Sequence, residues 1–257
     1  MKQILFKNTA EKKGRNIVIT PKNSTLEYLS VGRIILEDST NEISFASAES
    51  EISLICLKGN GAVSVDGKIF NVEQYDTIYI PRDSQVVVQT NTAVDFAECS
   101  APVTMKFEPA MVKFNQVKND DKQHMSLGKE TDKRELYTLV GDNVKGARLY
   151  NGITFISPGN WASWPPHEHT KTREEVYLYV NMPKPAFALQ LVYDDVNNPE
   201  HILPVFKDDA VVISSGYHPN VAIPGHEAIF VWMLCAKKEI EDRMWGGSIV
   251  QPEFLKK

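Results

Sequence analysis

The stretch "WPPHEHTKTREEVYLY", residues 164–179, decides how the rest of the chain is interpreted. His167 and His169 are two residues apart, so on a β-strand both imidazoles would lie on one face. Glu174 and Glu175 follow, and aromatic and aliphatic residues then alternate, as in a strand. The stretch therefore predicts either a metal site built on strands or two solvated histidines beside a charged loop.

Composition and charge exclude several classes of protein. The 257 residues are 42% hydrophobic and 24% charged, as in ordinary globular proteins, and the net charge of −5 offers no broad basic face for nucleic acid or an anionic membrane. The N-terminus lacks the apolar core of a signal peptide, and no apolar run approaches the roughly 20 residues that span a bilayer. Cys56, Cys99 and Cys235 are widely spaced, which predicts reduced core cysteines in a cytoplasmic protein.

Most of the chain has the pattern of short strands bounded by Gly, Pro, Asn and Asp, which favours an all-β sandwich or barrel. The best helical window is "AKKEIEDRMW", residues 236–245. The predicted strands are 51–57, 61–67, 76–81, 84–90, 148–157, 174–180, 186–193, 209–215 and 227–235.

The two halves of the chain resemble each other. "SVGRIILEDS" (30–39) lies over "LYNGITFISPGN" (149–160) when Gly32 is matched with Gly152. Further matches pair Glu51 with Glu175, Asp76 with Asp209, and Gln85 with His218. A duplicated β-unit is the simplest explanation. We expect units at 1–115 and 136–257, joined by the polar stretch 116–135 as a linker.

Four residues of the second unit form a candidate metal site: His167, His169, Glu175 and His218, the last in the turn "SSGYHP". Three imidazoles and one carboxylate suit Zn²⁺, with Mn²⁺, Fe²⁺ and Ni²⁺ as alternatives, and leave coordination positions open. The order of the four residues is the one that a cupin barrel uses. Five residues separate His169 from Glu175, one more than is usual there, so Glu174 stays open as the carboxylate ligand.

The first unit lacks these ligands. "SFASAES" stands opposite the histidine pair and Gln85 opposite His218, and Glu51 alone cannot hold a metal. We interpret the first unit as structural. The remaining histidines, His124, His201 and His226, are expected to be solvated.

Several side chains near the predicted ligands are candidates for contact with a substrate. Tyr177 and Tyr179 share the strand face of Glu175 and are either packing residues or catalytic groups. Gln190 and Tyr193, on a neighbouring strand, are predicted to line a polar pocket. Trp164, in a stiff loop before the ligands, is predicted to form a pocket wall.

The chain resembles the bicupin sugar-acid isomerases, the family of 5-deoxy-glucuronate isomerase and 5-keto-4-deoxyuronate isomerase. The segments "SPGNWASWPPHEH" and "SSGYHP" are most similar to the former, and "LGKETDKRELY" and "EVYLYVNMP" to the latter. The resemblance covers nearly the whole chain, with specific motifs only in the second half. It implies two cupin (jelly-roll) barrels in one chain and a homo-oligomer.

The same resemblance implies a metal-dependent aldose–ketose isomerase acting on a deoxy sugar acid, preferentially 5-deoxy-glucuronate. Such a reaction needs a Lewis acid and a group that moves a proton, for which Glu174, Tyr177, Tyr179 and a metal-bound hydroxide are candidates; a metal-assisted hydride shift would need no such group. A cation for the substrate carboxylate would come from Lys171, Arg173 or Arg148. The alternatives are 5-keto-4-deoxyuronate isomerase, a cupin dioxygenase and a sugar-binding cupin without activity.

Overall fold

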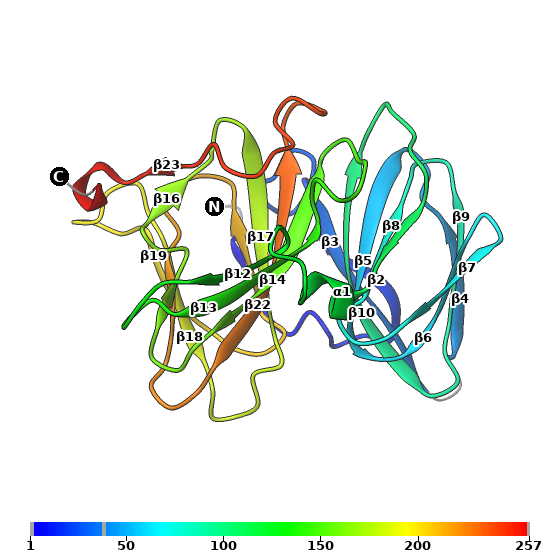
Figure 1. Cartoon of the computed structure of the whole chain (residues 1–257), viewed down its shortest axis with the longest axis horizontal. Helices are drawn as coiled ribbons and strands as arrows, with labels where there is room; N and C mark the ends of the chain where they lie inside the picture. The colour runs from blue at the N-terminus through cyan, green and yellow to red at the C-terminus, as the bar shows by residue number, and fades with distance from the viewer. Residues whose placement is uncertain (1–2, 38–39, 256–257) are drawn as a thin grey trace.

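The computed structural model describes residues 3–37 and 40–255 and consists almost entirely of β-strands arranged as two barrels side by side (Figure 1). The strands of the first barrel are β2 (Gly14–Ile19), β3 (Ser30–Glu37), β4 (Glu42–Ala46), β5 (Ser50–Gly59), β6 (Gly61–Val65), β7 (Lys68–Val72), β8 (Thr77–Ile80), β9 (Gln85–Gln89), β10 (Ala93–Pro102) and β11 (Ala110–Val112). They form a six-stranded sheet, β11-β8-β5-β10-β3-β2, and a four-stranded sheet, β4-β9-β6-β7.

The second barrel repeats this plan with a seven-stranded sheet, β1-β20-β17-β22-β14-β13-β12, and a four-stranded sheet, β15-β21-β18-β19. Its strands are β1 (Leu5–Phe6), β12 (His124–Leu127), β13 (Arg134–Val140), β14 (Leu149–Ile156), β15 (Trp161–Ala162), β16 (His167–Glu168), β17 (Arg173–Val180), β18 (Ala188–Val192), β19 (His201–Val205), β20 (Ala210–Ile213), β21 (Asn220–Ala222), β22 (Ala228–Ala236) and β23 (Ile249–Val250). The helices are α1 (Phe114–Val117) and the 3₁₀ turn η1 (Pro252–Phe254), and no helix in the described ranges is long and apolar enough to cross a membrane.

Segments outside the predicted second unit, 136–257, add strands to the large sheet of the second barrel. β1 pairs with β20, so the start of the chain adds an edge strand to the second barrel. The stretch 116–135, expected as a linker, contains β12, which pairs with β13 and extends the same sheet. Its polar composition reflects an edge strand with one solvated side.

The two large sheets pack face to face, and β17 shows why their strands are buried on both sides. Every residue of β17 is buried. Val176, Leu178 and Val180 belong to the core between the barrels, whereas Tyr177 and Tyr179 belong to the core inside the second barrel. Because side chains alternate along a strand, Glu174 and Glu175 must point to opposite sides.

The register of these sheets corrects the repeat alignment by one residue. Gly32 and Gly152 are equivalent, as predicted, but counting along the paired strands makes Glu51 the equivalent of Glu174 and Ile52 the equivalent of Glu175. The cross-strand pairs that establish this are Gly32–Glu98 and Glu51–Ala101 in the first barrel, and Gly152–Trp232 and Glu174–Cys235 in the second. A one-residue slip reverses the face to which a side chain points, so Glu51 has no counterpart role in a metal site.

Glu51 and Glu174 instead form reciprocal contacts between the barrels. The Glu174 carboxylate accepts hydrogen bonds from the backbone N–H groups of residues 27–29, directly before β3. The Glu51 carboxylate accepts them from residues 147–149, where β14 begins, and from the hydroxyl of Tyr79. Each barrel therefore supplies the acceptor for three backbone amides of the other.

Of the predicted elements, all nine strands are present within about two residues of their expected ends, a usual error for strand boundaries. The helix expected at 236–245 is absent, and these residues form turns after β22. Ile240 has a positive φ of 66°, and Asp242 accepts a hydrogen bond from the backbone of Lys238. Contacts of this segment with the barrel override its helical pattern.

Candidate metal centre

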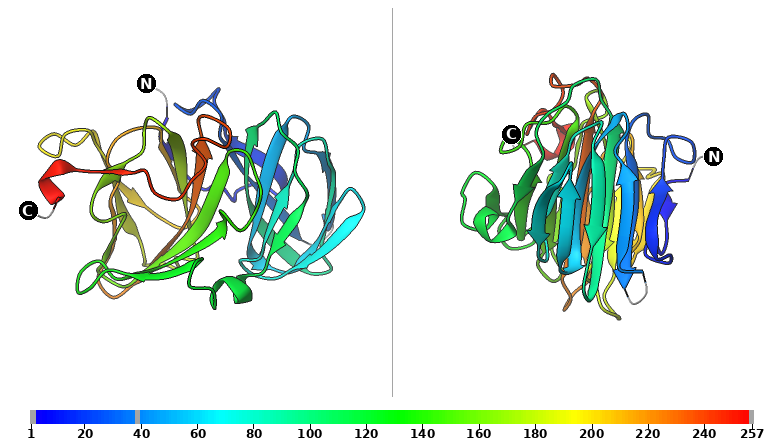
Figure 2. Two further views of the ribbon diagram at one scale, coloured as in Figure 1. Left: turned by 45° about the horizontal axis from the view of Figure 1, so that its top comes forward. Right: turned by 90° about the vertical axis from the view of Figure 1, so that its right-hand side faces the viewer.

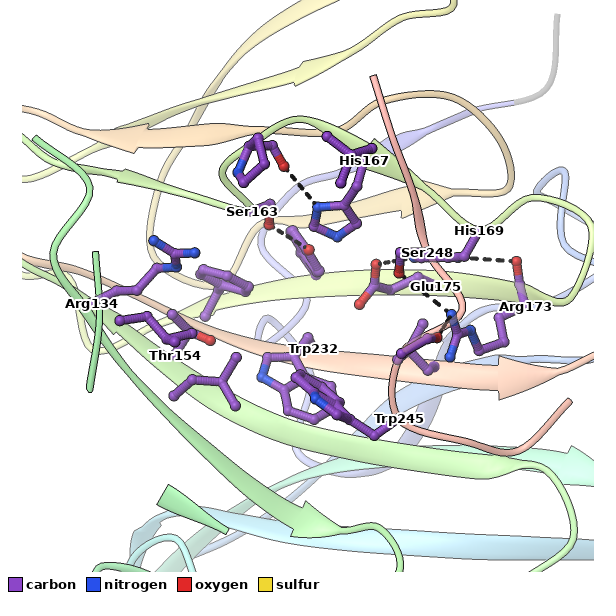
Figure 3. Close-up of a pocket in the computed structure, with 18 residues that line it drawn as sticks. Arg134, Thr154, Ser163, His167, His169, Arg173, Glu175, Trp232, Trp245 and Ser248 are labelled. Atoms are coloured by element: carbon purple, nitrogen blue, oxygen red, sulfur yellow. Dashed lines mark hydrogen bonds and ion pairs between the residues drawn. The ribbon is translucent and has the colours of Figure 1, made fainter. Parts of the chain in front are cut away.

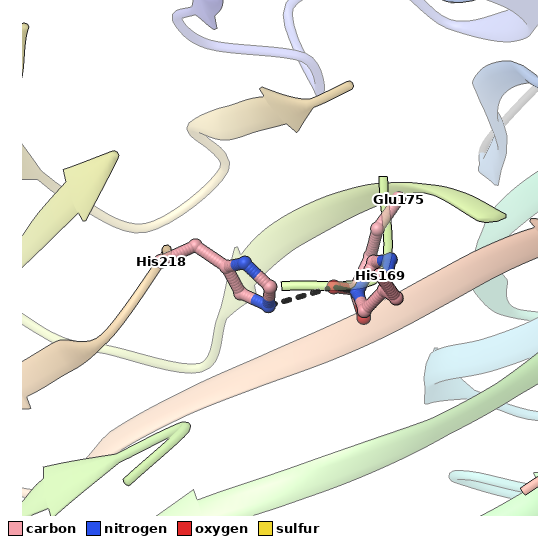
Figure 4. Close-up of side chains that lie close together, drawn as sticks. All are labelled: His169, Glu175 and His218. Carbon is pink, nitrogen blue, oxygen red and sulfur yellow. Dashed lines mark hydrogen bonds and ion pairs between the residues drawn. The ribbon is translucent and has the colours of Figure 1, made fainter. Parts of the chain in front are cut away.

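The strand β17 carries Glu175 into the second barrel, where the side chain meets two histidines (Figure 4). Nε2 of His169 lies 3.1 Å, and Nε2 of His218 3.4 Å, from the same carboxylate oxygen. All three side chains are buried. Their nitrogen and oxygen atoms are close enough together to bind one metal ion.

His218 reaches this position through the turn after β20. Gly216 has a φ of 88°, a conformation that favours glycine, and a Cβ there would lie 2.9 Å from the carbonyl oxygen of Tyr193. Gln190 supports the turn from the neighbouring strand, since its amide donates to the carbonyl oxygens of His218 and Pro219. Gln85, matched with His218 in the sequence comparison, is instead exposed on β9.

His167 lies on β16, beside this group of three, and β16 pairs with β23 near the end of the chain. Its ring centre lies 4.9 Å from that of His218. In all three histidines Nδ1 faces a backbone carbonyl oxygen, which selects the tautomer with Nε2 free to bind a metal. The Nδ1–oxygen distances are 3.0 Å from His167 to Pro165, 3.3 Å from His169 to Arg173 and 2.9 Å from His218 to Gly216.

Two further observations fit a metal ion at this place. Nε2 of His218 is fully buried without a hydrogen-bond partner among the described residues, which is costly unless another ligand satisfies it. Burial lowers the pKa of His167, and burial together with the neighbouring imidazoles lowers the pKa of His218 well below its usual value. Both rings are therefore neutral at neutral pH, the form that binds metals.

The candidate metal centre opens into a cavity of about 280 Å³ within the second barrel (Figure 3). Most of the wall is apolar, and a few polar side chains interrupt it, as is usual for small-molecule sites. Its apolar members include Leu127, Leu136, Phe230, Trp232, Leu234 and Trp245.

The C-terminal segment closes one side of this cavity. It crosses the second barrel in red in Figure 1 and is seen from two other sides in Figure 2. The terminal nitrogens of Arg173 donate to the carbonyl oxygens of Met244 and Gly246. Arg173, predicted to bind substrate, lines the cavity while it holds this segment in place.

The three side chains that are candidates for proton transfer have different surroundings. Tyr177 lines the cavity, and its hydroxyl lies 2.8 Å from that of Ser163. Burial and the charge of Glu175 raise the pKa of Tyr177 well above its usual value, so its hydroxyl stays protonated. Tyr179 lies outside the cavity wall and donates to Gln190. Glu174 is held on the opposite face of the sheet.

The other residues predicted to contact substrate also lie outside the cavity wall. Gln190 is buried beneath it, with its amide and carbonyl groups hydrogen-bonded. The hydroxyl of Tyr193 donates to Gln251 of the C-terminal segment. The ring of Trp164 packs against Trp161 and Phe254. These side chains position the loops around the site.

Among the wall residues that sequence reasoning missed are Arg134 and Trp232, whose indole N–H adds a polar group to an apolar ring. Arg134 falls in the stretch interpreted as a linker, and Trp232 in an apolar run that predicts only a buried strand. The repeat alignment contained one usable signal. Gly152 lies opposite Trp232, and a Cβ at this glycine would lie 2.3 Å from the indole ring.

Comparison with known proteins agrees with this geometry. The sequence pattern of the KduI/IolB family matches residues 4–249. The chain is 24% identical over 248 residues to a 4-deoxy-L-threo-5-hexosulose-uronate ketol-isomerase of Caldicellulosiruptor bescii, covering 93% of this chain and 87% of that protein. It is 28% identical over 228 residues to a 5-deoxy-glucuronate isomerase of Lacticaseibacillus casei, covering 83% of each.

Solved structures show the same fold. An IolB-like protein of Salmonella typhimurium LT2 superposes with a TM-score of 0.86 at 22% identity, covering 98% of both chains. A variant of oxalate decarboxylase from Bacillus subtilis superposes with a TM-score of 0.66 at 12% identity, covering 97% of this chain and 80% of that chain. The predicted all-β fold of two cupin barrels is thereby confirmed.

Proposed function

We propose that this chain, which belongs to the KduI/IolB family, is a sugar-acid isomerase that uses one divalent metal ion held by His167, His169, Glu175 and His218. The observation that carries the proposal is the pair of imidazoles of His169 and His218 on one buried carboxylate oxygen at a cavity, with a third imidazole beside them and Nδ1 of each ring on a backbone carbonyl. A bound metal would act as a Lewis acid on the carbonyl and neighbouring hydroxyl of an α-hydroxy carbonyl substrate. We propose Zn²⁺ as that metal.

The protein itself supplies a largely apolar cavity and a proton donor. Tyr177 stays protonated, lines the cavity and contacts Ser163, so its hydroxyl can donate to a substrate oxygen whose charge changes during isomerisation. The aromatic wall excludes water from the reacting carbons. Of the three side chains predicted to move a proton, Tyr177 is the one in contact with the cavity.

For the substrate we propose 5-deoxy-glucuronate, because the motifs around the metal ligands are most similar to that branch of the family. The product would be 5-dehydro-2-deoxy-gluconate, formed when the carbonyl moves from C1 to C2. The rival substrate is 5-keto-4-deoxyuronate. We propose a cytoplasmic homo-oligomer, in keeping with three buried cysteines that are unpaired.

The test is to determine the metal content of the purified protein, incubate it anaerobically with each of the two sugar acids, and follow carbonyl migration by NMR. Conversion without oxygen is expected and excludes a dioxygenase. Failure to convert either acid with metal bound would contradict the proposal.

Matched variants test the ligand set. His218→Ala should lose the metal and the activity, whereas Gln85→Ala, in the other barrel, should keep both. If His218→Ala retained full metal content and activity, the proposed ligands would be wrong.

A further inference from the structure

The cavity wall contains a buried hydrogen-bond donor that no protein group satisfies. Trp232 is only 3% exposed, and its Nε1 is buried without a hydrogen-bond partner among the described residues. A buried N–H without an acceptor destabilises a protein, so such a group calls for an explanation. Since Trp232 lines the cavity, an oxygen atom of a bound ligand can satisfy it.

Arg134 is a second unusual feature of the wall. Its side chain is only 10% exposed. Its terminal nitrogens donate to the backbone carbonyl oxygens of Asp132 and Trp164, which fix the plane of the guanidinium group. Among the described residues its Nε–H has no protein acceptor. The Asp132 carboxylate lies 3.4 Å from one of the terminal nitrogens, longer than a strong charge-assisted hydrogen bond, so the guanidinium can still bind an anion in the cavity.

The sheet register shows how far each of these groups lies from the metal ligands along the barrel. Residues paired across the strands form rows, and successive rows on the inner face are two residues apart. Starting from the row of Glu175, the next row contains Trp232, the one after it Thr154, and the last Arg134. Each step covers two residues of a strand, about 7 Å along the backbone. The Arg134 side chain shortens this separation, because it reaches back to the carbonyl oxygen of Trp164, next to Ser163, whose hydroxyl contacts that of Tyr177. Figure 3 shows the same order, with Arg134 and Thr154 on one side, Glu175 and His169 on the other, and Trp232 between them.

We propose that the cavity binds sugar acids in a single direction, with the carboxylate on Arg134, a hydroxyl oxygen of the chain on the indole N–H of Trp232, and the carbonyl end at the histidine–glutamate cluster. The inference rests on the proposed function for the nature of the substrate. It adds the residues that recognise the acid group and the order in which the substrate lies.

The three cations considered from the sequence are less suited to this role. Arg173 is buried and lines the cavity, but it lies at the metal end, where its carbonyl oxygen faces His169 Nδ1 and its terminal nitrogens hold the C-terminal segment. Arg148 donates to three backbone carbonyl oxygens near the junction of the barrels, away from the cavity wall. Lys171 is exposed to solvent. Arg134 is the cation of the cavity wall that lies away from the metal ligands.

A pair of sugars that differ only at C6 tests the inference directly. D-glucuronate carries a carboxylate where D-glucose carries CH₂OH, and binding of each to the metal-loaded protein can be measured by calorimetry and by tryptophan fluorescence. We expect glucuronate to bind at least about tenfold more tightly than glucose, because charge-assisted hydrogen bonds exceed neutral ones.

Substitution of Arg134 should act on one sugar alone. Arg134→Gln should weaken glucuronate binding by about 10- to 100-fold and change glucose binding less than about twofold. Arg134→Lys should restore part of the preference. Trp232→Phe should weaken both sugars to a similar degree, because the hydroxyl that it contacts is present in both. Lys171→Met, an exposed control next to the ligands, should change neither.

The inference is overturned if wild-type protein binds both sugars equally or binds neither, or if Arg134→Gln weakens both alike with unchanged metal content and circular dichroism. The outcome is separate from that of the proposed function. A preference for glucuronate that depends on Arg134 supports the binding direction even if neither deoxy sugar acid is isomerised. Isomerisation with an unaffected Arg134→Gln variant refutes the direction alone.

Discussion

The two barrels share a fold and differ in what fills them. Inside the first, aliphatic side chains such as Ile52 and Leu54 form a closed core. At the equivalent positions the second barrel has Glu175 and Tyr177, and around them lie a cavity and three histidines. Both barrels contribute their large sheets to the common core between them. The comparison teaches that the fold is maintained by the outer faces of these sheets, while the inner faces are free to become core or active site.

The largest effect is expected from making the second barrel resemble the first. Glu175→Ile copies the residue at the equivalent position, Ile52. We expect metal affinity and isomerase activity to fall by about 10³-fold or more, since a ligand worth several kcal/mol is lost. The protein should stay folded, because the same residue packs well in the first barrel. Elemental analysis, turnover and thermal unfolding measure the three quantities. Retention of metal with full activity would point to a different carboxylate ligand.

The reverse exchange, Ile52→Glu, should cost stability without creating a site. It would bury a carboxylate among aliphatic side chains with no histidine nearby, so we expect a loss of about 3–5 kcal/mol in the free energy of unfolding. Chemical denaturation measures this loss, and Ile52→Val is the conservative control. A second bound metal ion in Ile52→Glu would show that the first barrel still contains a latent site.

The reciprocal carboxylates should respond alike although only one belongs to the active barrel. Glu51→Gln and Glu174→Gln each weaken charge-assisted hydrogen bonds to three backbone amides, and we expect each to reduce stability by about 2–3 kcal/mol. Both variants should retain their metal. Denaturation curves and metal content test this symmetry. Loss of metal in Glu174→Gln alone would return Glu174 to the list of candidate ligands.

The smallest effect is a change in KM that distinguishes the two equivalent glycines. A Cβ at either glycine would meet a backbone oxygen of the neighbouring strand, that of Asn16 at 2.5 Å from Gly32 and that of Tyr137 at 2.1 Å from Gly152. At Gly152 it would also lie 2.3 Å from the indole ring of Trp232. Overpacking costs about 1–3 kcal/mol, so both alanine variants should lose stability. Gly152→Ala should in addition displace Trp232 and raise the KM, whereas Gly32→Ala should leave the KM unchanged. Equal KM values in both variants would show that Trp232 does not contribute to substrate binding.

Strand positions, and the histidines that we propose as ligands, could be recognised from the sequence because both depend on local patterns. The alternation in "EEVYLYV" and the i, i+2 spacing of His167 and His169 are visible in the sequence itself. The choice between Glu174 and Glu175 depended on register, and the sequence repeat was wrong there by one residue. Register is set by pairing between strands far apart in the chain, which a visual comparison of two segments does not resolve.

The cation of the cavity could not be predicted for a related reason. Arg134 enters the site because β13 pairs with β14. Nothing in "ETDKRELY" distinguishes it from a solvated charge. The helix predicted at 236–245 is absent for the same reason, because the conformation of this segment is set by contacts with the barrel rather than by its own sequence pattern. Nearness in sequence suggested Arg173, which lines the cavity, and Lys171, which is exposed, whereas Arg134 reaches the cavity through strand pairing.

The exchange of amides between the barrels also has a consequence for synthesis of the chain. Residues 27–29 leave the ribosome long before Glu174, the acceptor of their N–H groups, has been made. β1 likewise waits for β20. Domains that emerge first usually fold first, but the first barrel of this chain cannot complete its contacts until much of the second has been translated. During synthesis, residues 27–29 and β1 must therefore remain without their native partners until Glu174 and β20 have been translated.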